Sequence, residues 1–129
     1  MAVGAKACQH PLMPPSVLIV DDHPSFRLTA RALLEAEGFD VVGEAADGES
    51  AIEAAHRLRP EVLLLDIQLP DIDGFDVTER LMSNGSSPVI VLTSSRDASE
   101  FGALVERSGA RGFIPKAELS GAALAALLA

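Results

Sequence analysis

Short apolar runs alternate along the chain with longer segments in which apolar residues recur at helical spacing. The runs cover residues 17–20, 41–45, 62–65, 89–92 and 112–114. Each is too short for a helix, and most lack alternating polar positions, which is typical of strands buried on both faces of a sheet. We therefore predict five β-strands in these ranges.

A stripe of apolar residues follows each predicted strand and predicts a helix there. The first stripe, at positions i, i+4, i+7 and i+8, consists of Phe26, Ala30, Leu33 and Leu34. Comparable stripes lie within 51–58, 101–105 and 124–128, and the stretch 75–82 gives the remaining helix. Local signals limit three of the helices, since Pro24 lies just inside the first start, Gly38 lies just past its end, Pro60 closes the second and Gly85 closes the third.

Strands that alternate with helices predict the fold class. Five βα units favour an α/β fold, a doubly wound parallel sheet of five strands, because right-handed crossovers place helices on both faces. In the common strand order 2-1-3-4-5, strands 1 and 3 are neighbours where the winding reverses. Ligands of such sheets bind beyond the carboxyl ends of the strands at that point.

The length of 129 residues fits one domain, and 48% hydrophobic with 22% charged residues is the balance of a folded chain. We expect residues 1–15, closed by Pro14 and Pro15, to form a flexible tail, and residues 16–129 to form the domain. At this length we expect no separate output domain.

Charge and composition exclude several classes of function. A formal net charge of -9 repels phosphate backbones and anionic lipid, so we expect no direct binding of nucleic acid or membranes. The lone Cys8 permits neither an internal disulfide nor a cysteine-based zinc site, and no apolar run is long enough for a membrane span. The start of the chain lacks the features of a secretory signal, which predicts a cytoplasmic protein.

Chemistry-bearing residues follow the predicted strands. Asp21 and Asp22 follow the first, Asp66 the third and Thr93 the fourth, and we expect the fifth strand to run through Pro115 to Lys116. Carboxylates crowded at one sheet edge repel one another, so either some stay protonated or a hard cation compensates them. Mg2+ suits this donor set, with Asp22 and Asp66 as direct ligands and Asp21 acting through water.

A carboxylate such as Asp66 can then act as a nucleophile toward phosphorus and form an acyl phosphate. Phosphoryl transfer mostly needs positioning and charge neutralisation. Lys116 offers a positive charge to one phosphoryl oxygen, the Thr93 hydroxyl can donate to a second, and Mg2+ can hold the third.

These motifs, taken in order, resemble the receiver domain of bacterial two-component response regulators. The matching segments are VLIVDDHP at 17–24, LLDIQLPDIDG at 64–74, VLTS at 91–94 and GFIPK at 112–116. The resemblance covers about residues 16–129 and implies a flavodoxin-like, CheY-like fold. By resemblance, a sensor histidine kinase or phosphotransfer protein is the phosphodonor.

The same resemblance assigns roles to single residues. It makes Asp66 the phosphoacceptor and implies Mg2+ ligands at Asp21, Asp22, Asp66 and the Gln68 backbone carbonyl. Thr93 would be the switch hydroxyl, Lys116 the phosphate-binding lysine and Phe113 the aromatic switch residue. Gln68 and Ser95 would flank the hydrolytic water and tune the lifetime of the phosphoryl group.

Two departures mark this chain within the family it resembles. Ala117 stands where many receivers have a proline, as in receivers of the LuxR/NarL type. Phe113 lacks the hydroxyl of the commoner tyrosine, so its buried rotamer leaves no polar group unsatisfied. We therefore hypothesise that the switch is biased inward without phosphate.

The implied output is a changed surface, formed by the fourth helix, fifth strand and fifth helix, and used for homodimerisation or for binding another protein. We expect it to contain Phe101, Leu104, Phe113 and Leu119. The domain would catalyse only its own phosphorylation and dephosphorylation, so we do not class it as an enzyme.

Alternative functions stay open. One is a receiver-like protein-interaction module that works without phosphorylation, against which the complete set of site residues argues. Another is an acid-phosphatase-like enzyme, against which Gln68 argues because that chemistry needs an acidic residue there. The chain is either a stand-alone receiver or a fragment of a LuxR/NarL-like transcription factor.

The run Asp71-Ile72-Asp73-Gly74 resembles part of a calcium-binding loop. The frame that places Gly74 at position 6 puts Leu69 at position 1 and Arg80 at position 12, so the motif fails. We predict instead a turn that shapes the backbone beside Asp66.

Overall fold

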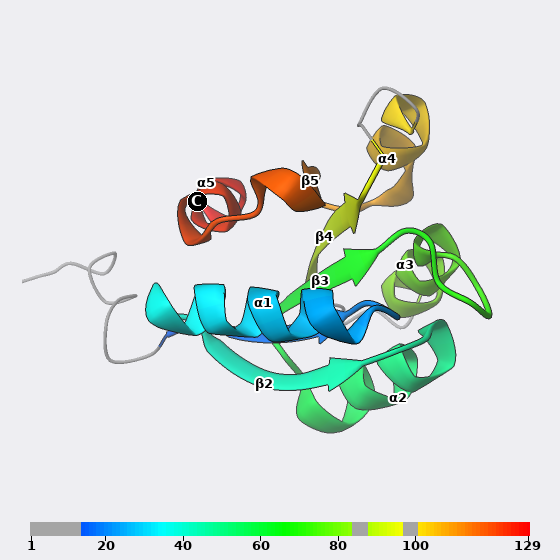
Figure 1. Cartoon of the computed structure of the whole chain (residues 1–129). Coiled ribbons are helices and arrows are strands. Elements are labelled where there is room, and N and C mark those ends of the chain that lie inside the picture. The colour runs from blue at the N-terminus through cyan, green and yellow to red at the C-terminus, as the bar shows by residue number, and fades with distance from the viewer. Residues whose placement is uncertain (1–13, 84–87, 97–100) are drawn as a thin grey trace, which may run out of the picture.

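Parallel strands form one sheet in the order β2-β1-β3-β4-β5 (Figure 1). The computed structural model describes residues 14–83, 88–96 and 101–129. Its strands are β1 (Ser16–Val20), β2 (Asp40–Ala45), β3 (Val62–Asp66), β4 (Val89–Ser94) and β5 (Gly112–Pro115). Its helices are α1 (Pro24–Ala36), α2 (Gly48–Leu58), α3 (Gly74–Met82), α4 (Gly102–Ser108) and α5 (Gly121–Leu128).

The predicted fold class, strand order and element types are therefore confirmed. One boundary prediction is wrong, because the last strand ends at Pro115 and Lys116–Glu118 forms a short 3-10 helix. The proposed tail lies largely outside the described residues, which begin at Pro14, and so does Gly85.

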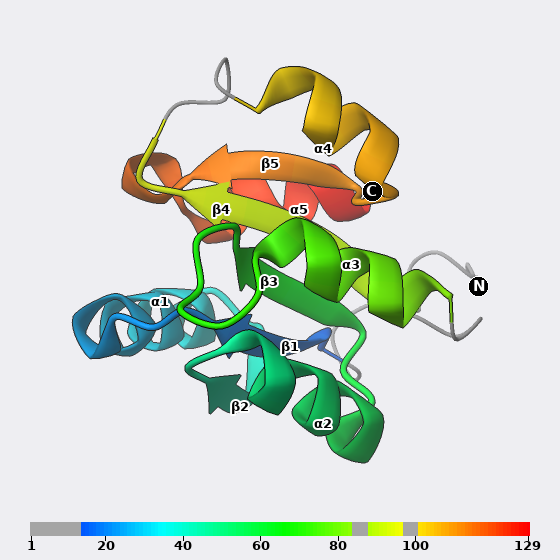
Figure 2. The same ribbon diagram turned by 90° about the vertical axis from the view of Figure 1, so that its right-hand side faces the viewer.

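The side chains of each strand alternate between two hydrophobic cores although the strands read as uniformly apolar. Leu18 and Val20 pack with α2, α3 and α4, whereas Val17 and Ile19 pack with α1 and α5. Figure 2 shows α2 and α3 in front of the sheet and α5 behind it. This two-sided burial explains why β1 and β3 contain no polar alternation.

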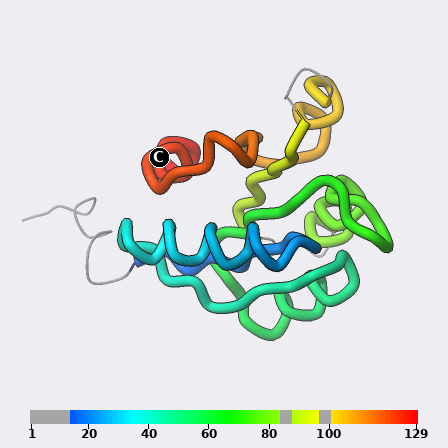
Figure 3. Tube along the Cα trace, viewed as in Figure 1, coloured from blue at the N-terminus to red at the C-terminus, as the bar shows by residue number. Residues whose placement is uncertain are grey.

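Strand register brings the expected site residues to one edge of the sheet. Val20 pairs with Leu65, so Asp21 emerges beside Asp66, and Asp66 pairs directly with Thr93 on β4. The loops that follow β1 and β3 leave the sheet at the same edge, as the Cα trace shows (Figure 3).

Side-chain caps begin three of the helices. The carboxylate of Asp47 accepts from Ser50 N–H at 2.8 Å, that of Asp73 accepts from Asp76 N–H at 2.9 Å, and the hydroxyl of Ser120 caps α5 in the same way. Each such cap contributes roughly 1 kcal/mol. These three helices begin where the sequence offers an acceptor for their first free N–H groups.

The loop between β3 and α3 is tightly closed. Gly74 N–H donates to the Ile67 carbonyl at 2.7 Å. A Cβ atom on Gly74 would lie 2.7 Å from the Asp66 carbonyl oxygen and 2.8 Å from Ile67 Cα. The predicted turn is thus present, and only glycine permits this backbone approach beside Asp66.

None of the helices in the described part of the chain is long and apolar enough to cross a lipid bilayer.

Replacing Gly74 with alanine should force the β3–α3 backbone apart. We expect Gly74→Ala to lower the free energy of unfolding by about 1–3 kcal/mol, measured by urea denaturation followed by circular dichroism. Gly102→Ala is the matched control, because no atom lies within 4 Å of the added Cβ, and it should stay within about 0.5 kcal/mol of wild type. Equal midpoints for Gly74→Ala and wild type would contradict the close approach.

Candidate functional site

Acidic side chains gather at the carboxyl ends of β1 and β3. Asp21, Asp22, His23 and Asp66 each offer a ligand atom, and these atoms all lie within 4.8 Å of one another. Asp21 is 0% exposed and Asp66 is 2% exposed. Such burial removes carboxylates from the water that normally stabilises their charge.

Lys116 reaches the acidic side chains from the end of β5. Its Nζ lies 2.6 Å from Asp21 Oδ2 and 3.3 Å from Asp66 Oδ2. The 3-10 turn that begins at Lys116 follows directly on β5, whose neighbour β4 carries Thr93. The structure therefore brings together Asp21, Asp22, Asp66, Thr93 and Lys116, which the sequence singled out.

The charges of this cluster do not balance. Three ionised carboxylates and one ammonium leave two negative charges uncompensated, apart from any proton on His23. Thr93 Oγ1 is buried and has no hydrogen-bond partner among the described residues. Among the same residues, Asp22 Oδ1 has only its 3.2 Å contact with His23 Nδ1, and Asp21 Oδ2 has only its ion pair with Lys116. A divalent cation fits the oxygens, and an oxygen-rich acceptor fits the free hydroxyl.

The surroundings shift the pKa of both central charged groups. Burial raises the pKa of Asp66, and this effect together with the charge of Asp21 outweighs the Gln68 N–H bond and the Lys116 ammonium. Burial alone would lower the pKa of Lys116, but the two carboxylates outweigh it and raise that pKa. Lys116 is therefore held as a cation at neutral pH.

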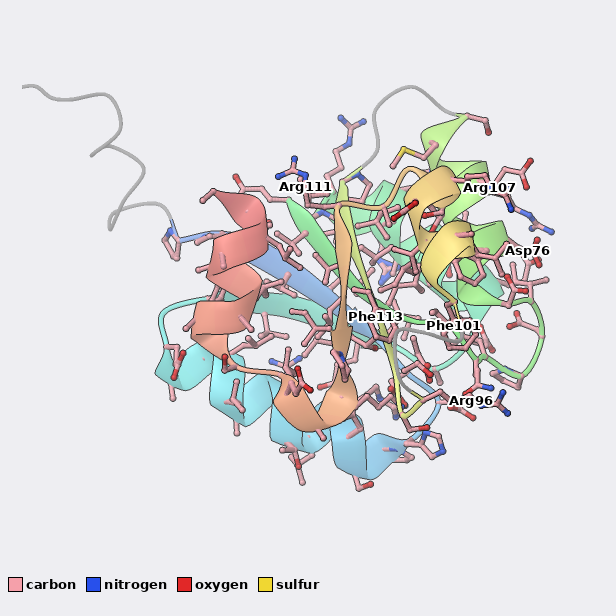
Figure 4. The ribbon with its side chains drawn as sticks, turned by 90° about the horizontal axis from the view of Figure 1, so that it is seen from above. Asp76, Arg96, Phe101, Arg107, Arg111 and Phe113 are labelled. Atoms are coloured by element: carbon pink, nitrogen blue, oxygen red, sulfur yellow. The ribbon has the colours of Figure 1, made fainter. Side chains whose placement is uncertain are left out.

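Gln68 and Phe113, two further predicted site residues, lie at the margins of the cluster. Gln68 is exposed and its N–H donates to Asp66 Oδ1 at 3.1 Å, which places its backbone at the acidic edge. Phe113 is half-buried, and its ring centroid lies 6.4 Å from that of Phe101 (Figure 4). Phe101 in turn lies 6.1 Å from Phe75, so three rings connect β5, the start of α4 and α3.

The residues of the expected output surface come from both faces of the sheet. Phe101 and Phe113 pack on the core beneath α2, α3 and α4, whereas Leu119 packs with α1 and α5. The 3-10 turn at Lys116–Glu118 separates Leu119 from β5. A surface formed by α4, β5 and α5 spans both faces, so its composition stays a prediction, and Leu104 is 49% exposed on α4.

Two residues beside the cluster, Arg27 and Phe26, had no role in the sequence-based prediction of the site. Arg27 donates to the Asp21 carbonyl oxygen and forms a 3.1 Å ion pair with Glu44 at the end of β2. The Phe26 ring lies 4.8 Å from Lys116 Nζ, a cation–π contact. His23 Nδ1 lies 3.1 Å from Asp21 Oδ1 at the exposed rim. The sequence signal that could have indicated a role for Arg27 was its position in the first turns of α1, shortly after Asp21 and Asp22.

Comparison with known proteins agrees with this geometry. The family model described as the response regulator receiver domain matches residues 17–128. BvgA of Bordetella pertussis is 39% identical over 102 residues, which cover 79% of this chain and 49% of BvgA. The transcriptional regulatory protein PdtaR of Mycobacterium tuberculosis is 32% identical over 117 residues, which cover 84% of this chain and 57% of PdtaR.

Solved structures give the same result. A LuxR-family two-component response regulator from Aurantimonas has a TM-score of 0.80 at 29% identity, covering 90% of this chain and 86% of that one. CheY in the CheX–CheY–BeF3–Mg2+ complex of Borrelia burgdorferi has a TM-score of 0.78 at 27% identity, covering 90% and 87%.

A doubly wound sheet with this acidic edge defines a receiver, and the chain belongs to the response regulator receiver domain family of two-component systems. The chain spans about half the length of the curated relatives it matches.

Removing one charge from the cluster should stabilise the metal-free protein. We expect Asp66→Asn to raise the free energy of unfolding at pH 7, in chelator, by on the order of 1 kcal/mol. Because the folded pKa of Asp66 is raised, its ionised form costs stability, and this cost fades as the pH falls through the folded pKa and is absent below the ordinary value of 3.8.

Denaturant titrations at several pH values test this expectation. Asp40→Asn makes the same chemical change at an exposed position on β2 and should leave stability nearly unchanged. A loss of stability in Asp66→Asn at pH 7 would show that the cluster is not strained by its charge.

Proposed function

We propose that Asp66 is the phosphoacceptor of this receiver and that phosphorylation controls a partner or output domain. The observation that carries this proposal is the buried Asp66 carboxylate, paired in sheet register with Thr93 and lying 3.3 Å from Lys116 Nζ. A nucleophile, a hydroxyl donor and a fixed cation thus surround one point at the sheet edge.

Mg2+ fits the donor set. The carboxylates of Asp21, Asp22 and Asp66, with the backbone carbonyl of Gln68, would hold it, because Mg2+ prefers oxygen ligands and two negative charges await compensation. When bound, Mg2+ supplies charge neutralisation for phosphoryl oxygens. The relative from Borrelia burgdorferi, whose structure contains BeF3 and Mg2+, supports this choice.

The phosphodonor would be a phosphohistidine on a sensor histidine kinase or a phosphotransfer protein. An Asp66 carboxylate oxygen forms a bond to phosphorus, the bond from phosphorus to the imidazole nitrogen breaks, and the imidazole leaves. Lys116 would pair with one phosphoryl oxygen, and the Thr93 hydroxyl would donate to another. That hydrogen bond would satisfy the buried hydroxyl that has no partner among the described residues.

The domain would act only on its own phosphoryl group, so we do not propose turnover of an external substrate. Gln68 and Ser95 are both exposed and would flank the approach of the hydrolytic water. Their side chains would then set the lifetime of the acyl phosphate. The cytoplasmic location and the lack of nucleic-acid binding stay predictions.

Phosphorylation would be read at the surface formed by α4, β5 and α5. Movement of Thr93 toward the phosphoryl group would open space for Phe113, whose ring contacts Phe101 at the start of α4. Phe101 directly precedes α4, on which Leu104 is 49% exposed, so a displaced Phe113 ring would act on that helix. We propose that this surface mediates homodimerisation or the binding of another protein.

Intact mass after incubation with acetyl phosphate tests the proposed chemistry. With Mg2+, the wild-type protein should gain one phosphoryl group that is stable in acid and labile in base. The adduct should be absent without Mg2+ and absent in Asp66→Asn. A folded wild-type protein that binds Mg2+ and gains no adduct would favour an interaction module that works without phosphorylation.

Sedimentation velocity tests the proposed output. Acetyl phosphate with Mg2+ should shift the protein from monomer toward dimer, and Leu104→Asp should weaken the dimer at least tenfold, since burying an unpaired charge costs more than about 1.4 kcal/mol. Leu28→Asp is the matched control, because Leu28 is 70% exposed on α1. Equal weakening by both substitutions would rule out the α4 face.

A further inference from the structure

The first turn of α2 is held by a side chain from a distant loop. Asp71, in the loop between β3 and α3, accepts hydrogen bonds from Gly48 N–H at 2.8 Å and from Glu49 N–H at 2.9 Å. The first N–H groups of a helix have no partner inside the helix, so this carboxylate satisfies two of them. The failed calcium motif of the sequence thus contains a remote helix cap.

Two further contacts join the same pair of segments. Ile72 packs so closely on Gly48 that a Cβ atom on this glycine would lie 2.3 Å from Ile72 Cγ1. Arg80 of α3 forms a 3.0 Å ion pair with Glu49 of α2, although both side chains are exposed. An exposed pair of this kind contributes little, so Asp71 and Ile72 make the principal contacts.

The Asp71 carboxylate accepts two hydrogen bonds from backbone N–H groups although the residue is exposed. Desolvation raises its pKa, but hydrogen bonds from backbone N–H groups, led by Gly48 and Glu49, outweigh this and lower the pKa to about 2. Charge-assisted bonds from N–H groups at a helix start are stronger than neutral ones. The Asp71 carboxylate is therefore ionised at neutral pH.

The other end of this loop belongs to the acidic site. The loop begins directly after Asp66, and Gln68 N–H donates back to Asp66 Oδ1 at 3.1 Å. It closes where Gly74 N–H donates to the Ile67 carbonyl at 2.7 Å. Asp71 lies between these two fixed points and ties the middle of the loop to α2.

We propose that Asp71 is a positioning residue for metal binding. By fastening the β3–α3 loop to the start of α2, it holds the Gln68 backbone in the place from which its carbonyl reaches the cation. This inference rests on the proposed function, which makes that carbonyl a Mg2+ ligand. It assigns to the residue after Pro70 a role in the site that its position on the surface does not suggest.

A purely stabilising cap would have a different signature, and the chain offers a matched control. Asp47 is the residue directly before α2, and its carboxylate caps the same helix by accepting from Ser50 N–H at 2.8 Å. This hydrogen bond lies within the start of α2 and does not involve the β3–α3 loop. Asp47→Ala and Asp71→Ala each remove one carboxylate cap from α2. Only Asp71→Ala also releases the loop.

The experiment compares these variants in three measurements: the thermal unfolding midpoint, Mg2+ affinity from an NMR titration of backbone amides, and hydrogen exchange at residues 67–74. We expect both variants to lower the unfolding midpoint to a similar extent. Asp71→Ala should also raise the Kd for Mg2+ about tenfold and speed exchange in the loop, whereas Asp47→Ala should leave both unchanged. Asp71→Asn, which keeps one acceptor oxygen, should lie between wild type and Asp71→Ala.

Each outcome decides the inference. Equal Mg2+ affinity in Asp71→Ala and Asp47→Ala would overturn it and leave Asp71 as an ordinary cap. If Asp71→Ala does not fold, Asp71→Asn against Asp47→Asn makes the same comparison. If the wild-type protein binds Mg2+ and is phosphorylated, and Asp71→Ala binds Mg2+ equally well, this inference is wrong while the proposed function stands. A wild-type protein that binds no Mg2+ overturns the proposed function and this inference with it.

Discussion

Electrostatic repulsion between buried carboxylates is the constraint on which the rest of this structure depends. Asp21 and Asp66 are almost fully removed from water, and among the residues that the structure describes Lys116 alone forms ion pairs with both. Side chains with like charges turn away from each other toward solvent unless a rigid backbone holds them together. Here that backbone is the centre of a parallel sheet with helices packed on both faces, and every residue of β3 is buried. Holding these carboxylates together thus lowers the free energy of unfolding of the metal-free protein, and a bound cation would raise it.

Most of the scaffold could be predicted from the sequence because two-sided burial leaves a strong signal. Uniformly apolar runs bounded by Gly, Pro and acidic residues mark strands that need no polar face. The order of strands then follows from general rules of handedness and winding. The same rules place Asp21, Asp66 and Thr93 together, since each stands at the end of a strand near the point of reversal. Their positions at the strand ends were sufficient to predict that these residues meet, because the strand backbone determines where each one lies.

The remaining contacts depend on side chains that reach between elements. Arg27 meets the Asp21 carbonyl and Glu44 only because α1 crosses the sheet at a particular angle, and Asp71 meets α2 across 23 residues of sequence. The local spacing of residues in the sequence predicts neither of these contacts. The end of the last strand is a further case, because a single 3-10 turn after β5 redirects the chain to the other face of the sheet. The apolar run does not show where that strand stops.

The three neighbouring phenylalanine rings, which are tilted to one another, have a practical consequence for observing a conformational change. The chain contains no tryptophan and no tyrosine, so its intrinsic fluorescence is almost dark. Phe101 lies in the middle of the chain of rings, between Phe75 on α3 and Phe113 on β5. A tryptophan placed there would be the sole strong fluorophore in the protein and would sit against both neighbours. Its emission would report, without any label, whether the rings of β5 and α3 stay together when the domain changes state.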